Sequence, residues 1–189
     1  MSRAVFLDRD GTINRAFVRG GKPYPPPTLE AFEYLPGAVD AICALKGAGF
    51  AIIVVTNQPD VARGRQSRAA VDAMHQRLLA ETSVDQVYAC FEEDSPACHC
   101  YKPKPGMLLD AARDHGLDLA GSFMVGDRWR DVGAGINAGC KTVFIDHGYA
   151  EPMDLKPDLV VASLAAAVEP LARGAPGGNA CWSKAERLG

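Results

Sequence analysis

The sequence has no long apolar run, no block of Lys and Arg, and no internal repeat. A membrane-spanning helix needs about 18 or more apolar residues in a row, so we expect no membrane partner. The net charge is −3 and the basic residues are scattered, which argues against nucleic acid as a partner. The N-terminal apolar stretch is short and runs directly into Asp8. It does not have the form of a signal peptide, so we expect a cytoplasmic protein. We also expect a monomer.

What the chain does contain fits one globular domain followed by a short tail. Its 189 residues are 48% hydrophobic and 23% charged, which is ordinary for a domain with a sizeable core. We expect this domain to span residues 1–173. Residues 174–189 are rich in Gly, Ala and charge, and include Cys181 and Trp182, so we expect a C-terminal tail. A protein of negative net charge that binds an anion must concentrate its positive charge at the site.

Apolar runs and amphipathic segments alternate along the chain. Runs rich in β-branched residues predict buried strands at 4–7, 50–55, 86–90, 122–125, 141–145 and 158–162. Apolar residues at helical spacing predict helices at 37–46, 67–81, 106–115, 129–138 and 164–172. This alternation predicts an α/β fold, a Rossmann-like three-layer sandwich around a central parallel sheet. His75 lies within one of these helices and is expected to be structural and partly buried.

Residues 13–28 do not fit this pattern. They include Gly20, Gly21 and four Pro, and can form neither a helix nor a central strand. We therefore expect a long loop after the first strand. Two interpretations stay open: the loop borders a functional site, or it is a surface excursion.

Polar side chains follow four of the predicted strands. In chain order these endings carry Asp8 and Asp10, Thr56 and Asn57, Lys102, and Asp127. Ligands of open α/β sheets bind beyond the carboxyl ends of the strands, so we expect the four endings to converge. Asp8 and Asp10 are close enough to repel each other unless a cation lies between them. A strand followed by an acidic turn is the alternative interpretation.

Four segments resemble the ordered motifs of the haloacid dehalogenase superfamily of phosphohydrolases. They are Asp8–Thr12, Thr56–Gln58, Lys102–Gly106, and Gly126–Arg128 together with Asp131. The ordered set is far more specific than any single motif, and the resemblance spans about residues 3–168.

A narrower resemblance rests on residues 7–14, on residues 62–64 and on a cluster of cysteines. These segments are similar to the branch that contains heptose bisphosphate phosphatases and histidinol-phosphate phosphatases. That branch has a minimal cap made of loops only. No stretch of this chain is long enough for an inserted cap domain, which agrees with a minimal cap of this kind.

The resemblance implies a covalent mechanism. Asp8 is expected to attack phosphorus and form an aspartyl-phosphate. Asp10 is expected to protonate the leaving oxygen and then to deprotonate water, a dual role that needs a pKa raised by a nearby carboxylate. The resemblance also implies a Mg²⁺ cofactor held by the Asp8 carboxylate, the main-chain oxygen of Asp10, and Asp127.

The remaining motif residues are expected to meet the phosphate. The Thr56 hydroxyl and Asn57 donate to its oxygens, Gln58 is a further substrate contact, and Lys102 neutralises the developing charge. Asp131 orients Lys102 or a metal-bound water. Considered without the other motifs, Thr56 reads as a helix cap and Lys102 as a solvated loop residue.

The segment at 90–100 contains Cys90, Cys98 and Cys100. In a reducing compartment such a cluster favours a metal over disulfides. The related phosphatases hold zinc there with Cys-x-His, a loop and Cys-x-Cys, which implies structural Zn²⁺ in this chain. Glu92 stands where the family has His, so the fourth ligand is Glu92, His99 or water. The remaining interpretation is three buried free thiols.

The residue before Lys102 is a second departure. The related enzymes carry Arg there, whereas this chain has Tyr101, which lacks the charge and the bidentate fork of Arg. If that Arg binds a second phosphate, then Arg63 or Arg128 must compensate here, or the substrate is no bisphosphate.

The expected partner is a small phosphorylated metabolite. The first choice is a sugar phosphate such as D-glycero-D-manno-heptose 1,7-bisphosphate, and the alternative is histidinol phosphate. A catalytically silent protein that binds a phosphorylated metabolite is a further alternative, against which the intact Asp8, Asp10, Lys102 and Asp127 argue.

Overall fold

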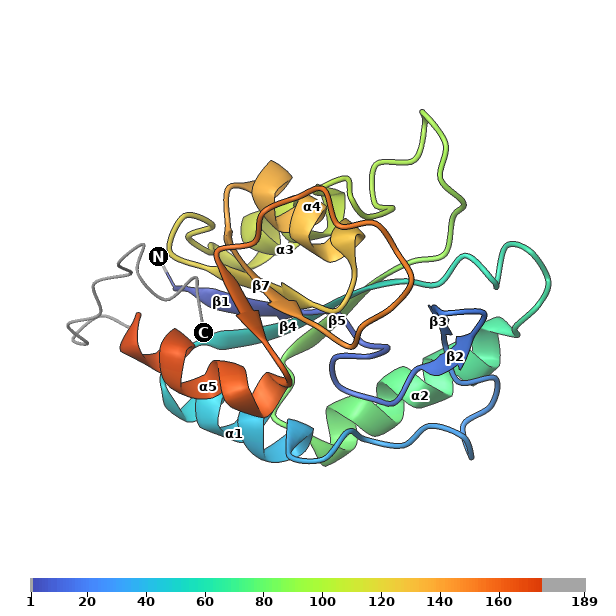
Figure 1. The fold of residues 1–189 in the computed structure, drawn as a ribbon, viewed down its shortest axis with the longest axis horizontal. Coiled ribbons are helices and arrows are strands. Elements are labelled where there is room, and N and C mark those ends of the chain that lie inside the picture. Colours follow the sequence, from blue (N-terminus) through green and yellow to red (C-terminus); the bar gives the residue numbers. More distant parts are fainter. Residues whose placement is uncertain (1, 175–189) are drawn as a thin grey trace.

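A six-stranded parallel sheet forms the centre of the molecule, in the order β5-β4-β1-β6-β7-β8 (Figure 1). The computed structural model describes residues 2–174, so the predicted tail beyond Gly174 lies outside the described residues. The strands are β1 (Ala4–Leu7), β4 (Ala51–Asn57), β5 (Gln86–Cys90), β6 (Phe123–Gly126), β7 (Lys141–Ile145) and β8 (Leu159–Val161). The helices are α1 (Ala38–Gly47), α2 (Arg68–Glu81), α3 (Gly106–His115), α4 (Trp129–Ala138) and α5 (Leu164–Arg173). The prediction of a three-layer α/β sandwich is confirmed.

Two hydrophobic cores hold the sheet between layers of helices. Successive side chains of a strand point to opposite faces. In β1, Val5 and Leu7 therefore pack with α1 and α5, whereas Ala4 and Phe6 pack with α3 and α4. Figure 1 shows α1, α2 and α5 on one face of the sheet and α3 and α4 on the other. All four β1 side chains are fully buried, which explains why this strand reads as an uninterrupted apolar run.

The helix boundaries follow local capping chemistry. Ser67 precedes α2, and its hydroxyl accepts a hydrogen bond of 3.1 Å from the Ala70 N–H, as expected of an N-cap. Gly116 ends α3 in the left-handed conformation, with φ at 62°. Such signals lie within a few residues of the boundary they set, so the sequence predicts these helices closely.

A small β-hairpin stands where the sequence predicts an irregular loop. β2 (Phe17–Arg19) pairs antiparallel with β3 (Lys22–Tyr24). The two residues between them, Gly20 and Gly21, have φ values of 56° and 74°, which a two-residue type I′ turn requires. Pro23 is tolerated because this sheet has only two strands and so each is an edge. The expectation that this segment has no regular structure is wrong.

The topology brings the strand endings together at one edge. β1 is central and pairs with β4 on one side and with β6 on the other, all parallel. The carboxyl ends of these strands therefore open into one crevice, at the position where open α/β sheets bind ligands. Among the helices of residues 2–174, none has the length and apolar character to cross a bilayer.

Candidate active site

Three buried carboxylates meet at the carboxyl edge of the sheet. Asp8 follows β1, Asp127 follows β6, and Asp131 lies in the first turn of α4. Oxygen atoms of the three side chains lie within 4.8 Å of one another. Burial raises the pKa of Asp8 to about 7; the Asp131 and Asp10 charges add to the rise, and Lys102 opposes it. Burial and the charges of Asp8 and Asp131 also raise the pKa of Asp127 well above its usual range.

The Asp127 carboxylate has the surroundings of a cation ligand. Both of its oxygens are buried and have no hydrogen-bond partner of good geometry, although the Tyr149 hydroxyl is near enough to offset part of the rise in its pKa. Buried unpaired carboxylates are costly, and a divalent cation bound by hard oxygen ligands relieves both this cost and the repulsion from Asp8. The predicted Mg²⁺ ligands Asp8 and Asp127 therefore fit the ion.

Gly11 makes this arrangement of carboxylates feasible. Its φ is +93°, and a Cβ atom built on it would lie 1.8 Å from Oδ2 of Asp127. The loop after β1 can pass against Asp127 only because residue 11 has no side chain.

Lys102 links two of the carboxylates. Its Nζ donates to Oδ1 of Asp8 at 2.6 Å, to Oδ1 of Asp131 at 2.6 Å and to the Val55 carbonyl at 2.8 Å. The side chain is buried, and the two carboxylate charges raise its pKa although burial alone would lower it. The ammonium group is therefore fixed in the charged form beside Asp8, and the expected contact between Asp131 and Lys102 is confirmed.

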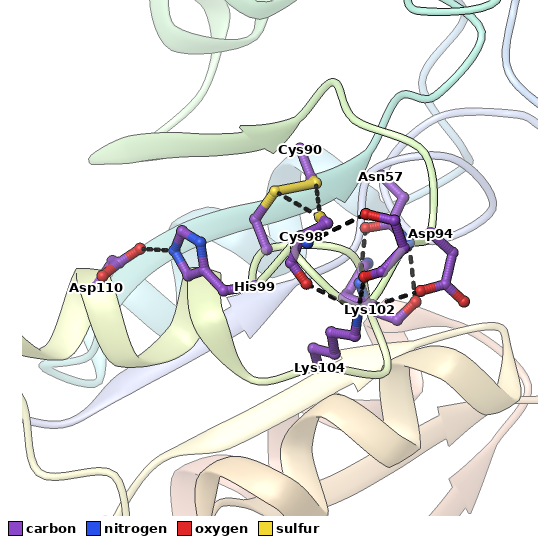
Figure 2. Close-up of a disulfide and its surroundings, with 10 residues drawn as sticks. Asn57, Cys90, Asp94, Cys98, His99, Lys102, Lys104 and Asp110 are labelled. Atoms are coloured by element: carbon purple, nitrogen blue, oxygen red, sulfur yellow. Dashed lines mark hydrogen bonds and ion pairs between the residues drawn. A yellow bond between two sulfur atoms is a disulfide. The ribbon is translucent and has the colours of Figure 1, made fainter.

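Asn57 fixes the main chain at Lys102 through both ends of its side-chain amide. Its Oδ1 accepts from the Lys102 N–H at 3.0 Å, and its Nδ2 donates to the Lys102 carbonyl at 3.1 Å (Figure 2). Each end of the amide makes one of these bonds, and Nδ2 carries a second N–H. The prediction that the Asn57 side chain donates to phosphate stays a prediction.

Asp10 is surrounded by donors rather than by acids. Arg9 donates to both of its oxygens, at 3.1 and 2.9 Å, and Asn14 and Gln58 add one bond each at 2.9 Å. Burial alone would raise the pKa of Asp10, but the charge and hydrogen bonds of Arg9, with those of Asn14 and Gln58, lower it. The prediction of a pKa raised by a neighbouring carboxylate is therefore wrong for this state of the site.

Arg9 is the residue that sequence reasoning missed. Its side chain is 0% exposed, and its Nη1 donates to Nε2 of His75 at 3.0 Å, because a guanidinium can only donate. Burial and the Arg9 charge lower the pKa of His75 to about 4, so its ring stays neutral and accepts this bond. The prediction of a buried, structural His75 is confirmed. No local signal marks Arg9, since an arginine between two aspartates reads as part of a solvated turn.

A cavity of about 210 Å³ opens over these groups. All the predicted catalytic and substrate-contact residues line it, namely Asp8, Asp10, Thr56, Asn57, Gln58, Arg63, Tyr101, Lys102 and Arg128. The Thr56 hydroxyl accepts a hydrogen bond from Gln58 at 2.9 Å, which leaves its own O–H free to donate into the cavity. The hairpin contributes Lys22 to Tyr24 to the lining, so the first of the two interpretations of residues 13–28 is correct.

Comparison with known proteins places this site in a family. The chain is 39% identical over 154 residues to the D-glycero-beta-D-manno-heptose-1,7-bisphosphate 7-phosphatase of Salmonella typhi, covering 74% of this chain and 79% of that one. Identity to the enzyme of the same name from Pseudomonas putida is 36%, covering 79% and 85%. The chain belongs to the haloacid dehalogenase-like (HAD) family of phosphatases. A model of that family, described as HAD-hydrolase-like, matches residues 99–167.

Solved structures of HAD phosphatases share the fold as well. The D,D-heptose 1,7-bisphosphate phosphatase from B. bronchiseptica, complexed with magnesium and phosphate, superposes with a TM-score of 0.73 at 32% identity, covering 89% of this chain and 97% of that one. A putative HAD-like phosphatase from Mesorhizobium loti superposes with a TM-score of 0.69 at 33% identity, covering 90% and 87%. The resemblance drawn from the four motifs is confirmed.

The cysteine loop differs from the HAD expectation. Cys90 and Cys100 form a disulfide, and the Cys98 sulfur lies 3.7 and 3.5 Å from theirs (Figure 2). The expectation that these cysteines form no disulfide is therefore wrong for this state, because the sulfurs of Cys90 and Cys100 are bonded to each other. Neither predicted fourth ligand joins them. Glu92 is exposed and lies outside the cluster, and the His99 ring turns away to bond Asp110 at 2.9 Å.

The two arginines expected to compensate for Tyr101 already have partners. Nε of Arg63 donates to Glu93 at 3.1 Å, and its Nη1 lies 3.5 Å from Asp60. Nε of Arg128 donates to Glu151 at 2.9 Å, and its Nη2 bonds the same carboxylate. Both arginines line the cavity, but each has a carboxylate that partly neutralises its charge.

Proposed function

We propose that this protein is a Mg²⁺-dependent phosphomonoesterase in which Asp8 forms an aspartyl-phosphate. The observation that carries the proposal is the position of Asp8, beside Lys102 and Asp127 and at the wall of the cavity. Asp8 attacks phosphorus, an O–P bond forms, and the P–O bond to the leaving group breaks. Water then attacks the aspartyl-phosphate, which releases inorganic phosphate and restores the Asp8 carboxylate.

The neighbouring residues supply charge and protons for these steps. Lys102 favours the ionised form of the Asp8 carboxylate, which attack requires, and stabilises charge on the phosphoryl oxygens. Asp8, the Asp10 main-chain oxygen and Asp127 would hold Mg²⁺, which when bound neutralises charge on phosphate and nucleophile. The Thr56 hydroxyl donates to a phosphoryl oxygen.

Asp10 acts as the acid and then as the base. Arg9 keeps it ionised before substrate binds, and the arriving phosphate charge raises its pKa so that it gains a proton. It gives this proton to the leaving oxygen and later takes one from the attacking water. Gln58, which bonds both Asp10 and Thr56, fixes the two side chains relative to each other.

For the substrate we propose a sugar bisphosphate of the heptose 1,7-bisphosphate type. The support is the activity printed in the names of the relatives, together with two cations of the cavity lining, Lys22 and Arg130, that have no carboxylate partner among residues 2–174. Histidinol phosphate carries an ammonium group, which these two cations disfavour.

The test is a comparison of kcat/KM for heptose 1,7-bisphosphate and histidinol phosphate in the presence of Mg²⁺. We expect the bisphosphate to be preferred by at least about 100-fold, which corresponds to about 2.7 kcal/mol. Preference for histidinol phosphate would overturn the substrate assignment. Binding of either compound without release of phosphate would support the catalytically silent alternative instead.

We also propose that the reduced cysteine loop holds structural Zn²⁺. In a tetrahedral site with Zn–S bonds of about 2.3 Å, sulfurs lie about 3.8 Å apart, and the distances of 3.7 and 3.5 Å from Cys98 fit this spacing. Cys90, Cys98 and Cys100 would ligate the ion, and no fourth protein ligand lies in the cluster among residues 2–174.

Metal analysis of protein purified under reducing conditions tests the zinc proposal. We expect about one zinc per chain in the wild type and in Cys43→Ala, whose thiol is exposed and remote from the cluster, and none in Cys98→Ala. Zinc near zero in freshly reduced wild-type protein would contradict the proposal.

The proposed substrate also bears on where the enzyme works. A phosphorylated metabolite is too highly charged to cross a bilayer unaided, so we propose that the enzyme acts in the cytoplasm. We propose a monomer whose site is complete without a second copy, since the proposed catalytic residues Asp8, Asp10, Thr56 and Lys102 all line one cavity. Gel filtration with light scattering at a mass near 20.1 kDa would support it.

A further inference from the structure

Most of the positive charge in the cavity is committed to carboxylates of the protein. Lys102 bonds Asp8 and Asp131. Arg63 pairs with Glu93 and Asp60, Arg65 lies 3.7 Å from Asp60, and Arg128 pairs with Glu151, as the ion pairs of the site show. A chain of net charge −3 therefore has little free cationic charge here to offer a second anionic group.

Arg130 and Lys22 are the exceptions. Both line the cavity, and within residues 2–174 neither has a carboxylate partner in the ion pairs or hydrogen bonds of the structure. Arg130 lies in the first turn of α4 and is half-buried, whereas Lys22 lies on β3 of the hairpin and is exposed. Two cations from different elements thus face one cavity without a protein counter-charge.

Tyr101 and Trp129 orient the Arg130 guanidinium. Its Cζ lies 5.6 Å from the centroid of the Tyr101 ring and 5.0 Å from that of Trp129. A guanidinium within about 6 Å of an aromatic centroid is attracted to the ring, and this attraction uses none of its N–H donors. Tyr101 is itself 5% exposed and fixed in the second hydrophobic core. Tyr101, which stands where the related enzymes carry Arg, therefore supports a cation from another segment, the guanidinium of Arg130.

We propose that Arg130, supported by Tyr101 and joined by Lys22, binds the anionic group of the substrate that is not hydrolysed. The inference rests on the proposed function and assigns the specificity of that site to residues of this chain. A guanidinium edge binds a phosphate with two parallel charge-assisted bonds. The enzyme therefore distinguishes a bisphosphate from the monophosphate that has the same scissile group.

The test compares heptose 1,7-bisphosphate with heptose 7-phosphate, which share the 7-phosphate and differ only in the second one. The measured quantity is the ratio of their kcat/KM values. In Arg130→Gln we expect this ratio to fall about 10-fold, mainly through KM of the bisphosphate. Arg130→Lys keeps the positive charge but loses the two parallel N–H donors of the guanidinium, so we expect the ratio of kcat/KM values to fall by about 3-fold. Arg113→Gln, at an exposed arginine outside the cavity, is the matched control with an unchanged ratio.

Two further variants separate recognition from misfolding. Lys22→Gln is expected to lower the same ratio by about 3-fold. Tyr101→Arg in the Arg130→Gln background restores a cation at the neighbouring position, and we expect at least a 3-fold recovery of the ratio. Thermal unfolding checks that each variant is folded.

The outcomes distinguish this inference from the function on which it rests. An unchanged ratio in folded Arg130→Gln, with both sugars hydrolysed, would overturn the role of Arg130 and leave the phosphatase proposal standing. If the wild type hydrolyses neither sugar, then the proposed function fails and the inference fails with it.

Discussion

At the scale of single residues, Asp8 carries an electrostatic cost that the rest of the site is arranged to offset. Burial, Asp131 and Asp10 raise its pKa to about 7, while Lys102 opposes the rise. An acid whose pKa is higher in the folded state than in the unfolded chain loses stability as pH rises between the two values. For Asp8 this window runs from 3.8 to about 7. Above it, the ionised carboxylate destabilises the metal-free fold.

Asp8→Asn should therefore stabilise the metal-free protein, and more so at high pH. We expect the difference in Tm between the variant and the wild type to grow as pH rises from about 4 to about 7 and then to level off. Mg²⁺ should raise Tm of the wild type and narrow this difference, because the cation favours the ionised carboxylate. Differential scanning calorimetry with and without Mg²⁺ measures both effects.

Asp10→Asn is a control in which the change in stability is expected to have the opposite sign to that of Asp8→Asn. The folded-state pKa of Asp10 is lowered, so its ionised form contributes stability above pH 3.8, and that contribution disappears as pH falls through the folded value. The variant should be less stable than the wild type at neutral pH. A Tm difference for Asp8→Asn that shrinks as pH rises would contradict the electrostatic account of the site.

Gly11→Ala tests whether close packing at residue 11 positions Asp127. A Cβ there would lie 1.8 Å from the carboxylate, so Asp127 must move and Mg²⁺ affinity should fall by at least about 10-fold. Gly20→Ala is the matched control, since Gly20 also has a positive φ but has no atom within 4 Å of the added Cβ. The Mg²⁺ concentration for half-maximal activity is the readout. Equal behaviour of the two variants would show that backbone strain alone is responsible.

The role of a residue could be predicted from the sequence where it depends on a nearby motif, and could not where it depends on contacts distant in the sequence. Asp8, Lys102 and Asp127 were predictable because each follows a strand within a recognisable motif. The environment of Asp10 was not, because it depends on Arg9, whose position is fixed by His75, 66 positions later. The same holds for Asn57, whose amide bonds the main chain 45 positions away.

At the scale of elements, the β2–β3 hairpin serves as the cap of this active site. It lines the cavity with Lys22, Pro23 and Tyr24 and takes no part in the main sheet. The Gly20–Gly21 turn signal was present in the sequence, but the density of proline around it favoured a loop. The strands and helices of the main domain were predicted closely because their apolar periodicity is set by burial between layers.

Replacing the hairpin with a short Gly-Ser linker should impair substrate binding more than chemistry. We expect KM for heptose 1,7-bisphosphate to rise about 10-fold or more, because Lys22 and the cavity wall are lost. Hydrolysis of p-nitrophenyl phosphate, which is too small to need that wall, should change by less than about 3-fold in kcat. Equal loss of activity on both substrates would show that the hairpin supports the catalytic groups themselves.

At the scale of the whole molecule, the fold collects charges that are far apart in the sequence. The chain has a net charge of −3, yet its carboxyl edge joins three acids, a buried lysine and several arginines around one cavity. The parallel sheet makes this convergence predictable in outline. Which cations stay free for substrate was not predictable, because it depends on ion pairs such as Arg128–Glu151 that join distant segments.

Removal of divalent metal should stop turnover without unfolding the protein. We expect activity to fall at least about 1,000-fold after exhaustive chelation and to return with Mg²⁺. Ca²⁺ should restore little, because it prefers more ligands at longer distances. Phosphate release and far-UV circular dichroism on the same samples check this. Undiminished activity in chelated protein would exclude Asp127 as the ligand of an essential metal.

The most direct measurement is the rate of phosphate release by Asp8→Asn, with heptose 1,7-bisphosphate and saturating Mg²⁺. The variant keeps the shape of the side chain but removes the nucleophilic oxygen anion. If Asp8 forms the bond to phosphorus, kcat falls at least about 1,000-fold while the protein stays folded. A folded Asp8→Asn that releases phosphate within about 10-fold of the wild-type rate would contradict the covalent mechanism and require another nucleophile.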